Sequence, residues 1–350
     1  MTNSLTRDLR QAWRTIRRTP VVAAVVIGSL GIGIGVNTAV FSWIEAVVLR
    51  PMPGVADAGS FHLVEARTEN GAHPGSSWLE YLDLRSRLSS LPTLLAFRMA
   101  PFTVGAADHF ERTYGQLVSG NFFSALGLQP AAGRFPRPEE VLRGGGYPVV
   151  VISHEFWATR YSRSPNAIGQ TLRVNEHPLT IIGVAPSGFQ GTVLGLNFDL
   201  WIPATMASVL FTGSRELDDR GSRGYNIMAR LESPVTLARA QGEADVAMRQ
   251  LAELYPETNA NVGAEVLPFW RAPRGPQLML ARALFLLQGI MLLVLLAVCG
   301  NTANLVLARA SARQREIGVR LALGASPWRI AALLLTESVT LALIGAAVGA

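Results

Sequence analysis

The segment GSLGIGIGVN, residues 28–37, decides the fold class of this chain of 350 residues. Four glycines within eight residues are typical of a loop that holds phosphate, and also of a membrane helix whose small side chains let a neighbour approach closely. The segment does not match Gly-x-Gly-x-x-Gly, because the sixth position is Val36 or Thr38. The chain also contains no lysine, which a Walker A loop requires. The glycines therefore indicate a membrane helix.

Helical spacing sorts the small residues of this segment into two stripes. At ~100° per residue, one stripe holds Gly28, Gly31 and Gly35, and the other holds Ser29, Gly33 and Asn37. Gly31 and Gly35 form a Gly-x-x-x-Gly motif, and an asparagine can form a hydrogen bond across a helix contact. Small residues that simply face lipid are the alternative interpretation. The predicted helix-packing residues are Gly28, Gly31, Gly35, Asn37, Asn301 and Asn304.

Three long apolar runs predict transmembrane helices. Residues 21–44 carry no charge and as a helix would span about 36 Å, which exceeds a hydrocarbon core of ~30 Å. A second uncharged run covers residues 283–308, and a third, residues 330–350, is interrupted only by Glu337. Because the chain ends inside the third run, we expect that helix to be cut short.

The distribution of arginine predicts the orientation in the membrane. Residues 1–50 hold six arginines and two acids, as do residues 281–350, whereas residues 51–280 hold 19 arginines and 21 acids. The basic ends belong in the cytoplasm and the central region outside it. Such a distribution argues against a nucleic-acid-binding surface. A cleavable signal peptide is the alternative for the N-terminus, but the apolar run is longer than the usual ~7–15 residues.

The region between the first two helices predicts an α+β domain. A Ser77–Glu80 capping box begins one helix, Thr236 begins a second, and Ser119 is expected to cap a short third. Residues 127–224 are rich in glycine and proline, which indicates a second lobe inserted into the first. Strands are predicted near residues 61–66, 94–104, 111–118, 148–153, 171–175, 179–184, 225–231 and 263–267, with a helix carrying Phe156 and Trp157 after the fourth strand.

Catalytic and metal-binding patterns are not found. The five histidines show no His-Glu-x-x-His spacing, and no serine lies in Gly-x-Ser-x-Gly. His154 and Glu155 are better explained as an exposed helix start, where a carboxylate suits the helix dipole. We therefore predict no catalytic residue, no metal site and no cofactor.

The segment after the second apolar run predicts an amphipathic cytoplasmic helix. Glu316 lies three residues after Arg313 and four before Arg320, so it can pair with both arginines. Gly324 is a natural C-terminal stop. A generic interfacial helix that anchors arginine to anionic lipid is the alternative.

Several long stretches of the sequence resemble a known protein family. The run CGNTANLVLARASARQREIGVRLALGASPWRIAALLLTES, within residues 293–343, resembles the FtsX-like permease domain of ABC transporters. SGNFFSALGLQPAAGRFPRPEE (119–140), PVVVISHEFWATRYS (148–162), IGQTLRVNEHPLTIIGVAPSGFQG (168–191) and DLWIPATM (199–206) resemble the periplasmic core domain of MacB-type permeases, and the N-terminal LRQAWRTIRRTPVVAAVVIGSLGIGIGVNTAVF fits as well. The similar subgroup is the large, often duplicated bacterial permeases encoded without an attached ATPase.

The resemblance implies a fold and a domain order. The fold is a membrane protein with transmembrane helices and a large extracytoplasmic α+β domain, which has a porter-like β-α-β part and an inserted lobe near 120–220. The implied domains are a cytoplasmic arginine-rich amphipathic N-terminus (1–20), transmembrane helix 1 (21–46), the MacB-like periplasmic core domain (50–280), transmembrane helix 2 (283–308), a cytoplasmic coupling segment (309–328) and an incomplete transmembrane helix 3 (330–350), with residues 283–350 starting the FtsX-like permease domain.

The resemblance also implies a function and partners. The chain would be the non-catalytic permease subunit of a mechanotransmission ABC transporter in the bacterial inner membrane, with its N-terminus in the cytoplasm. Its partners would be a separate cytoplasmic ABC ATPase, a second permease subunit (identical or different), a periplasmic adaptor and the lipid bilayer, with no nucleic acid. The residues implied in coupling to the ATPase are Arg313, Arg315, Glu316, Arg320 and Gly324.

Two other functions remain open from the sequence. One is a membrane-tethered extracytoplasmic binding or scaffold protein that engages no ATPase. The other is a periplasmic enzyme, for which no motif is found.

Overall fold

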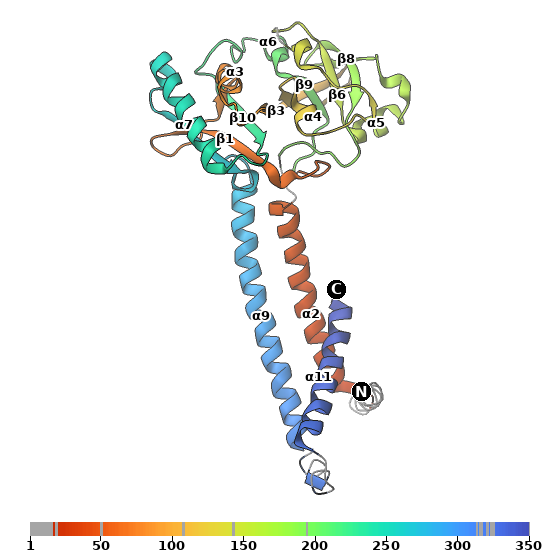
Figure 1. Ribbon diagram of the computed structural model, residues 1–350. Helices are drawn as coiled ribbons and strands as arrows, with labels where there is room; N and C mark the ends of the chain where they lie inside the picture. Colours follow the sequence, from red (N-terminus) through yellow and green to blue (C-terminus); the bar gives the residue numbers. More distant parts are fainter. Residues whose placement is uncertain are drawn as a thin grey trace. The chain divides into compact units, whose positions relative to one another are not determined.

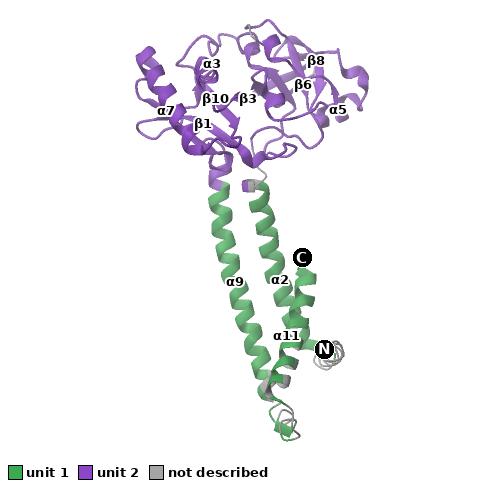
Figure 2. Cartoon of the chain, in the orientation of Figure 1, with its two compact units in different colours: residues 1–46, 280–350 green, residues 47–279 purple. Residues whose placement is uncertain are grey.

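The computed structural model describes residues 17, 20–49, 52–106, 109–141, 144–193, 195–312, 314, 318–319, 322 and 326–349. The chain divides into two compact units, each described by itself below. One unit contains residues 1–46 and 280–350, and the other contains residues 47–279 (Figure 2).

The first unit is helical. It contains α2 (Pro20–Ile44), the greater part of α9 (Gln277–Ala312) and α11 (Pro327–Gly349). Glu45–Leu49 follows α2 as a π-helical turn. Pro20–Ile44 and Gln277–Ala308 are long and apolar enough to cross a membrane by length and composition. Ser338–Gly349 of α11 is a shorter apolar stretch.

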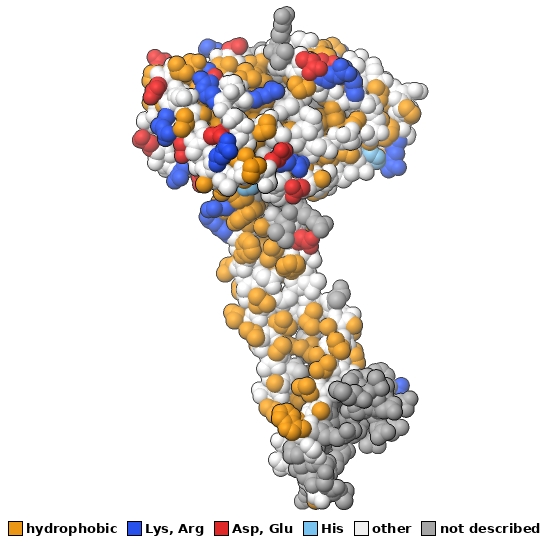
Figure 3. All heavy atoms as spheres, in the orientation of Figure 1, with side chains coloured by type: hydrophobic (Ala, Val, Ile, Leu, Met, Phe, Trp, Pro, Cys, Tyr) orange, Lys and Arg blue, Asp and Glu red, His pale blue; other side chains and the backbone are white. Residues whose placement is uncertain are grey.

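The surface of this unit is apolar. The most apolar part of α9 is not buried against the rest of the chain, and Leu286, Leu293 and Leu296 are each more than two-thirds exposed. Figure 3 shows hydrophobic side chains along the visible face of this unit, whereas acidic and basic side chains gather on the other unit. Such a surface suits lipid better than water.

The second unit is built on one mixed sheet. Its strand order is β11-β1-β10-β3-β4-β9-β6-β8-β5, with β2 beside β10 and β7 beside both β3 and β8 (Figure 1). The strands are β1 (Phe61–Thr68), β2 (Ser76–Ser77), β3 (Leu95–Ala106), β4 (His109–Val118), β5 (Ala132–Gly133), β6 (Val149–Ile152), β7 (Thr171–Val174), β8 (His177–Val184), β9 (Leu200–Pro203), β10 (Arg223–Arg230) and β11 (Val262–Pro268).

Helices α3 (Trp78–Arg87) and α7 (Leu237–Leu254) are the longest helices described within this unit. Shorter helices are α4 (Phe122–Ala125), α5 (His154–Tyr161), α6 (Ala207–Leu210) and α8 (Pro256–Asn259). Short 3₁₀ turns occupy Ala58–Ser60, Pro138–Val141, Pro165–Ala167, Ala204–Met206 and Phe269–Arg271. The α+β fold class predicted from the sequence is confirmed.

The two faces of the sheet bury different cores. Because successive strand residues point to opposite faces, Phe97 and Trp201 join one core cluster, while their neighbours Ala96 and Leu200 join the other. Both clusters draw residues from the part of the chain before residue 119 and from the predicted insertion. The insertion, which carries β5 to β9, therefore extends the same sheet and shares its core.

Strand β7 closes part of this sheet into a ring. The pairs β3–β4, β4–β9, β9–β6, β6–β8, β8–β7 and β7–β3 form a closed circuit of six strands. The buried side chains of these strands that belong to one core cluster include Phe102, Val104, Leu117, Val150, Ile152, Val174, Ile181 and Ile202. A closed circuit leaves no free strand edge.

Helix starts were predicted with mixed success. The Ser77–Glu80 capping box is confirmed, and Thr236 caps α7 as expected. The prediction that Ser119 caps a helix is wrong, because α4 begins at Phe122 and Asn121 occupies its N-cap position. Ser119 lies at the end of β4, where its hydroxyl accepts a hydrogen bond from Ala96 N at 3.0 Å. The Ser119 hydroxyl therefore pairs with the backbone N–H of Ala96 in β3 and does not cap α4.

The β7–β8 hairpin turns earlier than predicted. The turn is made by Asn175 and Glu176, at φ 46° and 68°, and β8 starts at His177. The Asn175 side chain accepts from Thr103 N at 2.8 Å and donates to Leu210 O at 3.1 Å. Its own N–H donates to Thr103 O at 2.8 Å. Asn175 therefore holds β7 against β3 and closes the ring.

Replacing Asn175 tests this closure. We expect Asn175→Ala to destabilise the chain by about 1–3 kcal/mol, because the half-buried N–H of Thr103 in β3 and the backbone oxygen of Leu210 in α6 lose their partners. Glu176→Gly is the matched control, since glycine adopts the same positive φ without strain and should keep or raise stability. The thermal unfolding of the full chain in detergent measures both, and equal midpoints for the two variants would contradict the role of Asn175.

Candidate functional site

The predicted glycines of α2 lie against α11. A Cβ atom on Gly31 would be 3.3 Å from the Gly345 oxygen, and one on Gly35 would be 2.9 Å from the Gly349 oxygen. The partner glycines are equally crowded, since a Cβ on Gly345 would be 2.9 Å from the Cβ of Leu30. Real Cβ atoms essentially never come within 3.0 Å of another atom, and 3.3 Å is already a tight contact. The two helices therefore touch backbone to backbone (Figure 1).

This contact uses two copies of one motif. Gly345-x-x-x-Gly349 in α11 mirrors Gly31-x-x-x-Gly35 in α2. The second copy was not predicted, although residues 345–349, GAAVG, contain the same spacing of glycines. A small apolar cluster of Ala23, Val26, Leu30 and Leu341 extends the same interface.

Asn37 connects α2 to α9 instead. Its Nδ2 donates to the backbone oxygens of Gly33, at 2.9 Å, and Met291, at 3.0 Å. Gln288 Nε2 donates in turn to Asn37 Oδ1 at 2.8 Å. Gly33 permits the approach, since a Cβ there would be 3.1 Å from Leu295 Cδ1. Gln288 was not predicted, and its uncharged, polar side chain inside an apolar run was the available signal.

The structure does not bring every predicted packing residue together. No atom of the described residues lies within 4 Å of a Cβ built on Gly28, and Asn301 and Asn304 are exposed. Arg313, Arg315, Glu316, Arg320 and Gly324, the predicted coupling residues, lie outside the described residues. Among the described residues, no group of three or more metal-ligating side chains is found.

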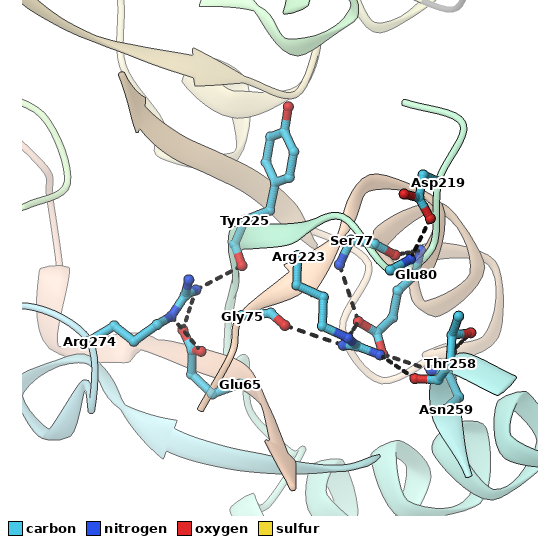
Figure 4. Close-up of polar contacts among 11 residues, drawn as sticks. Glu65, Gly75, Ser77, Glu80, Asp219, Arg223, Tyr225, Thr258, Asn259 and Arg274 are labelled. Carbon is cyan, nitrogen blue, oxygen red and sulfur yellow. Dashed lines mark hydrogen bonds and ion pairs between the residues drawn. The ribbon is translucent and has the colours of Figure 1, made fainter. Parts of the chain in front are cut away.

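Arg274 connects strands β1 and β10 of the second unit to the segment just before α9. It lies three residues before Gln277, where α9 begins. Its guanidinium donates to both oxygens of Glu65, at 3.2 and 3.3 Å, and to the backbone oxygen of Tyr225, at 2.7 Å (Figure 4). It also donates to the backbone oxygen of Gly224 at 3.1 Å. It also reaches the Asn226 amide oxygen at 2.7 Å. One side chain thus joins β1, β10 and the segment that leads into α9.

Because Glu65 is buried, the stability of this cluster depends on the positive charge of Arg274. Its side chain is 1% exposed, and burial raises the pKa of its carboxyl, while Arg274 opposes that rise. A buried carboxylate without a partner is strongly unfavourable. Arg274 is therefore required to keep Glu65 ionised inside the sheet.

A second buried carboxylate, Glu80, connects its own helix α3 to β10 and α8. It receives a 2.7 Å hydrogen bond from Arg223 of β10 and a 3.1 Å hydrogen bond from Asn259 of α8 (Figure 4). Arg223 also donates to the Thr258 oxygen at 3.2 Å. Since Glu80 belongs to the capping box of α3, this cluster fixes α3, α8 and β10 together.

The comparisons with known proteins point to one family. Residues 23–246 match the MacB-like periplasmic core domain, and residues 289–350 match the FtsX-like permease C-terminal domain. The macrolide export ATP-binding/permease protein MacB of Burkholderia thailandensis is 28% identical over 237 residues, which cover 67% of this chain and 34% of that protein. The protein of the same description from Burkholderia orbicola is 26% identical over 363 residues, which cover 96% of this chain and 48% of that protein.

The chain spans a third to about half the length of these curated relatives. Among solved structures, the periplasmic region of MacB from Actinobacillus actinomycetemcomitans is 14% identical with a TM-score of 0.45, over 61% of this chain and 90% of that one. The two family matches carry more weight, because residues 23–246 alone are more than half of the chain.

A matched pair of alanine substitutions tests the glycine contact. We expect Gly35→Ala to lower stability by about 1–3 kcal/mol, because its methyl group would meet the Gly349 backbone. Gly28→Ala should raise stability by up to ~1 kcal/mol, because alanine favours the helix and has open space at that position. Thermal unfolding of the full chain in lipid nanodiscs measures both. A stabilising Gly35→Ala would show that α2 and α11 do not pack closely.

Removing Arg274 should make stability depend strongly on pH. In Arg274→Gln the Glu65 carboxyl loses its cation, so its raised pKa rises further and the folded state binds a proton that the unfolded state releases. We expect a loss of about 3–5 kcal/mol near neutral pH that shrinks as the pH falls towards 5. Arg67→Gln, at an exposed pair with Glu265, is the control and should change little. A pH-independent loss in Arg274→Gln would refute the unpaired-carboxylate account.

Proposed function

The chain belongs to the MacB-like periplasmic core domain family and continues into an FtsX-like permease domain, and on this basis we propose that it is the permease subunit of an ABC transporter. The proposal rests on the match of both family models to one chain, with the periplasmic core domain first and the permease domain after it. The helices that flank residues 47–279 are long and apolar enough to cross a bilayer, which supports it. Residues 47–279 then form the extracytoplasmic domain of a membrane protein.

The mechanism we propose is mechanotransmission. A separate cytoplasmic ATPase would close on ATP and move the membrane helices, and the extracytoplasmic domain would push substrate outward. Movement of this kind requires helices that shift as rigid bodies with few side-chain obstacles. The glycine contact between α2 and α11 would provide a surface without side-chain obstacles, and the Asn37 hydrogen bonds, which link α2 to α9, would let these two helices move together.

The proposed assembly contains two permease subunits above two ATPase subunits, with a periplasmic adaptor as a further partner. ATP hydrolysis would belong to the partner, and this chain would contribute no catalytic group. Its N-terminus and residues 309–328 would face the cytoplasm of a bacterial cell, because arginine concentrates in both.

The proposed coupling residues provide the test. Glu316→Ala with Arg320→Ala should weaken binding of the partner ATPase about tenfold, which corresponds to ~1.4 kcal/mol, and should lower its ATP turnover. Glu257→Ala with Arg249→Ala removes the same charges from the extracytoplasmic unit and serves as the control. Co-purification and ATP hydrolysis in nanodiscs measure both effects.

Two outcomes separate the alternatives: one comes from the Glu316 and Arg320 variant, and the other from a chain in which residues 309–326 are scrambled. Unchanged binding and turnover in the Glu316 and Arg320 variant would remove these residues from coupling. A chain that keeps its cellular role when residues 309–326 are scrambled at constant charge would be a membrane-tethered scaffold rather than a transporter subunit.

A further inference from the structure

One face of the β3–β4 hairpin carries large apolar side chains that are exposed. Met99 of β3 is 42% exposed, and Phe110 and Tyr114 of β4 are 52% and 50% exposed. In the antiparallel register Tyr114 lies opposite Pro101, and Phe110 lies opposite Gly105. Because side chains alternate along a strand, these residues share one face of the hairpin. The residues that alternate with them in β3 belong to the buried core, so this face is the outer one.

Two arginines lie on the same outer face. Arg112 of β4 is the cross-strand neighbour of Thr103, between the rows that contain the two aromatic rings. On β7, Val174 pairs with Val104, and both are buried in the core. Arg173 is the next residue along β7, so its side chain points outward beside β3. Both arginines are exposed.

No carboxylate of the described residues neutralises these arginines. Glu111 precedes Arg112 in the sequence but points to the opposite face of β4, where it pairs with Arg160. Arg173 donates to the backbone oxygen of Glu176 at 3.0 Å, which is an uncharged acceptor. Among the described residues of β3, β4 and β7 that point outward, none is an aspartate or a glutamate. The face is therefore apolar and positively charged.

The composition of this face is typical of a protein interface. Aromatic residues, methionine and arginine are enriched at such interfaces, and acidic residues are depleted there. Large apolar side chains that adjoin on one exposed surface also mark interaction sites. A sheet surface on which side chains stand next to one another suits a second polypeptide better than a small molecule, which requires a concave site.

We propose that this outer face of β3, β4 and β7 binds an acidic segment of a partner protein, whose carboxylates pair with Arg112 and Arg173 and whose apolar side chains pack on Phe110 and Tyr114. An acidic partner supplies the charge that the face lacks, whereas a basic partner is repelled by the two arginines. The face lies within residues 47–279 and does not involve an ATPase, so it can be tested separately from the transport function.

The probe is a short synthetic peptide in which glutamate and leucine alternate, and its neutral control has glutamine in place of glutamate. Fluorescence anisotropy of the labelled peptides measures binding to the full chain in phosphatidylcholine nanodiscs, against empty nanodiscs. We expect saturable binding of the acidic peptide, with the neutral peptide at least about fivefold weaker and the difference reduced at high salt. No saturable binding of the acidic peptide, or equal affinity for the two peptides, would overturn the proposal.

Removing the charges identifies the surface. Arg112→Gln with Arg173→Gln should weaken binding of the acidic peptide about tenfold and leave the neutral peptide unchanged. Arg215→Gln with Arg249→Gln, at exposed positions elsewhere in the same unit, is the matched control and should keep wild-type affinity. Phosphatidylglycerol vesicles that bind through Arg112 and Arg173, in the absence of peptide binding, would instead assign this face to a lipid surface.

Removing the apolar contacts tests the other half of the surface. Phe110→Ser with Tyr114→Ser should weaken both peptides about tenfold, because the apolar side chains of each lose their contacts. The thermal unfolding midpoint should change little, since both side chains are exposed. Val246→Ser with Leu254→Ser, at exposed positions of α7, is the control. Wild-type affinity in the Phe110 and Tyr114 variant would contradict the proposed contact.

Discussion

The pairing of β1 with β11 is the constraint on which the extracytoplasmic unit depends. These strands run antiparallel over seven residue pairs, from His62 opposite Pro268 to Thr68 opposite Val262. The start of the first long strand therefore lies beside the end of the last one. A domain inserted between two membrane helices must return the chain to where it left, and this pairing accomplishes it with backbone hydrogen bonds alone. All the other strands are added beyond β1, on the side away from β11.

Arg274 strengthens the same region with side-chain contacts. Burying Glu65 in β1 would be unfavourable without a cation, and Arg274 brings that cation from the segment just before α9. The guanidinium group also satisfies two backbone oxygens of β10. Backbone pairing and a buried ion pair thus fix the same few residues, so the strand that begins the unit and the segment that ends it form one rigid element.

The alternating glycines of α2 follow from a helix with two neighbours. Gly31 and Gly35 face α11, whereas Gly33 and Asn37 face α9. Steps of two residues rotate a helix by ~200°, so alternate positions fall on nearly opposite sides. Lipid supplies no hydrophobic force between helices, which leaves close backbone contact and polar hydrogen bonds as the available attractions. The face of α2 towards α11 uses mainly close backbone contact, and the face towards α9 uses mainly hydrogen bonds.

Local features of the fold were predictable from the sequence, and pairings between distant segments were not. The capping box at Ser77 and the start of α7 depend on neighbouring residues, and these predictions are confirmed. The three apolar runs lie in helices, and two of these helices are long and apolar enough to cross a membrane. The strand order, the closure of the ring by Asn175 and the use of Ser119 as a sheet contact depend on segments tens of residues away. The Arg274 cluster was missed for the same reason, since Arg274 and Glu65 lie 209 residues apart in the sequence.

Strand β10 connects a cavity of about 450 Å³, whose wall includes Arg98, Phe211 and Glu216, to the segment before α9. Tyr225 also lines this cavity, and its backbone oxygen accepts from Arg274. Gly224 likewise lines the cavity and accepts from the same guanidinium group. A shift of this part of β10 would therefore move two of the acceptors that hold Arg274, and the remaining partners, Glu65 and Asn226, would have to follow or lose their hydrogen bonds. Because an unpaired Glu65 carboxylate is strongly unfavourable, the cluster should move as a whole rather than break.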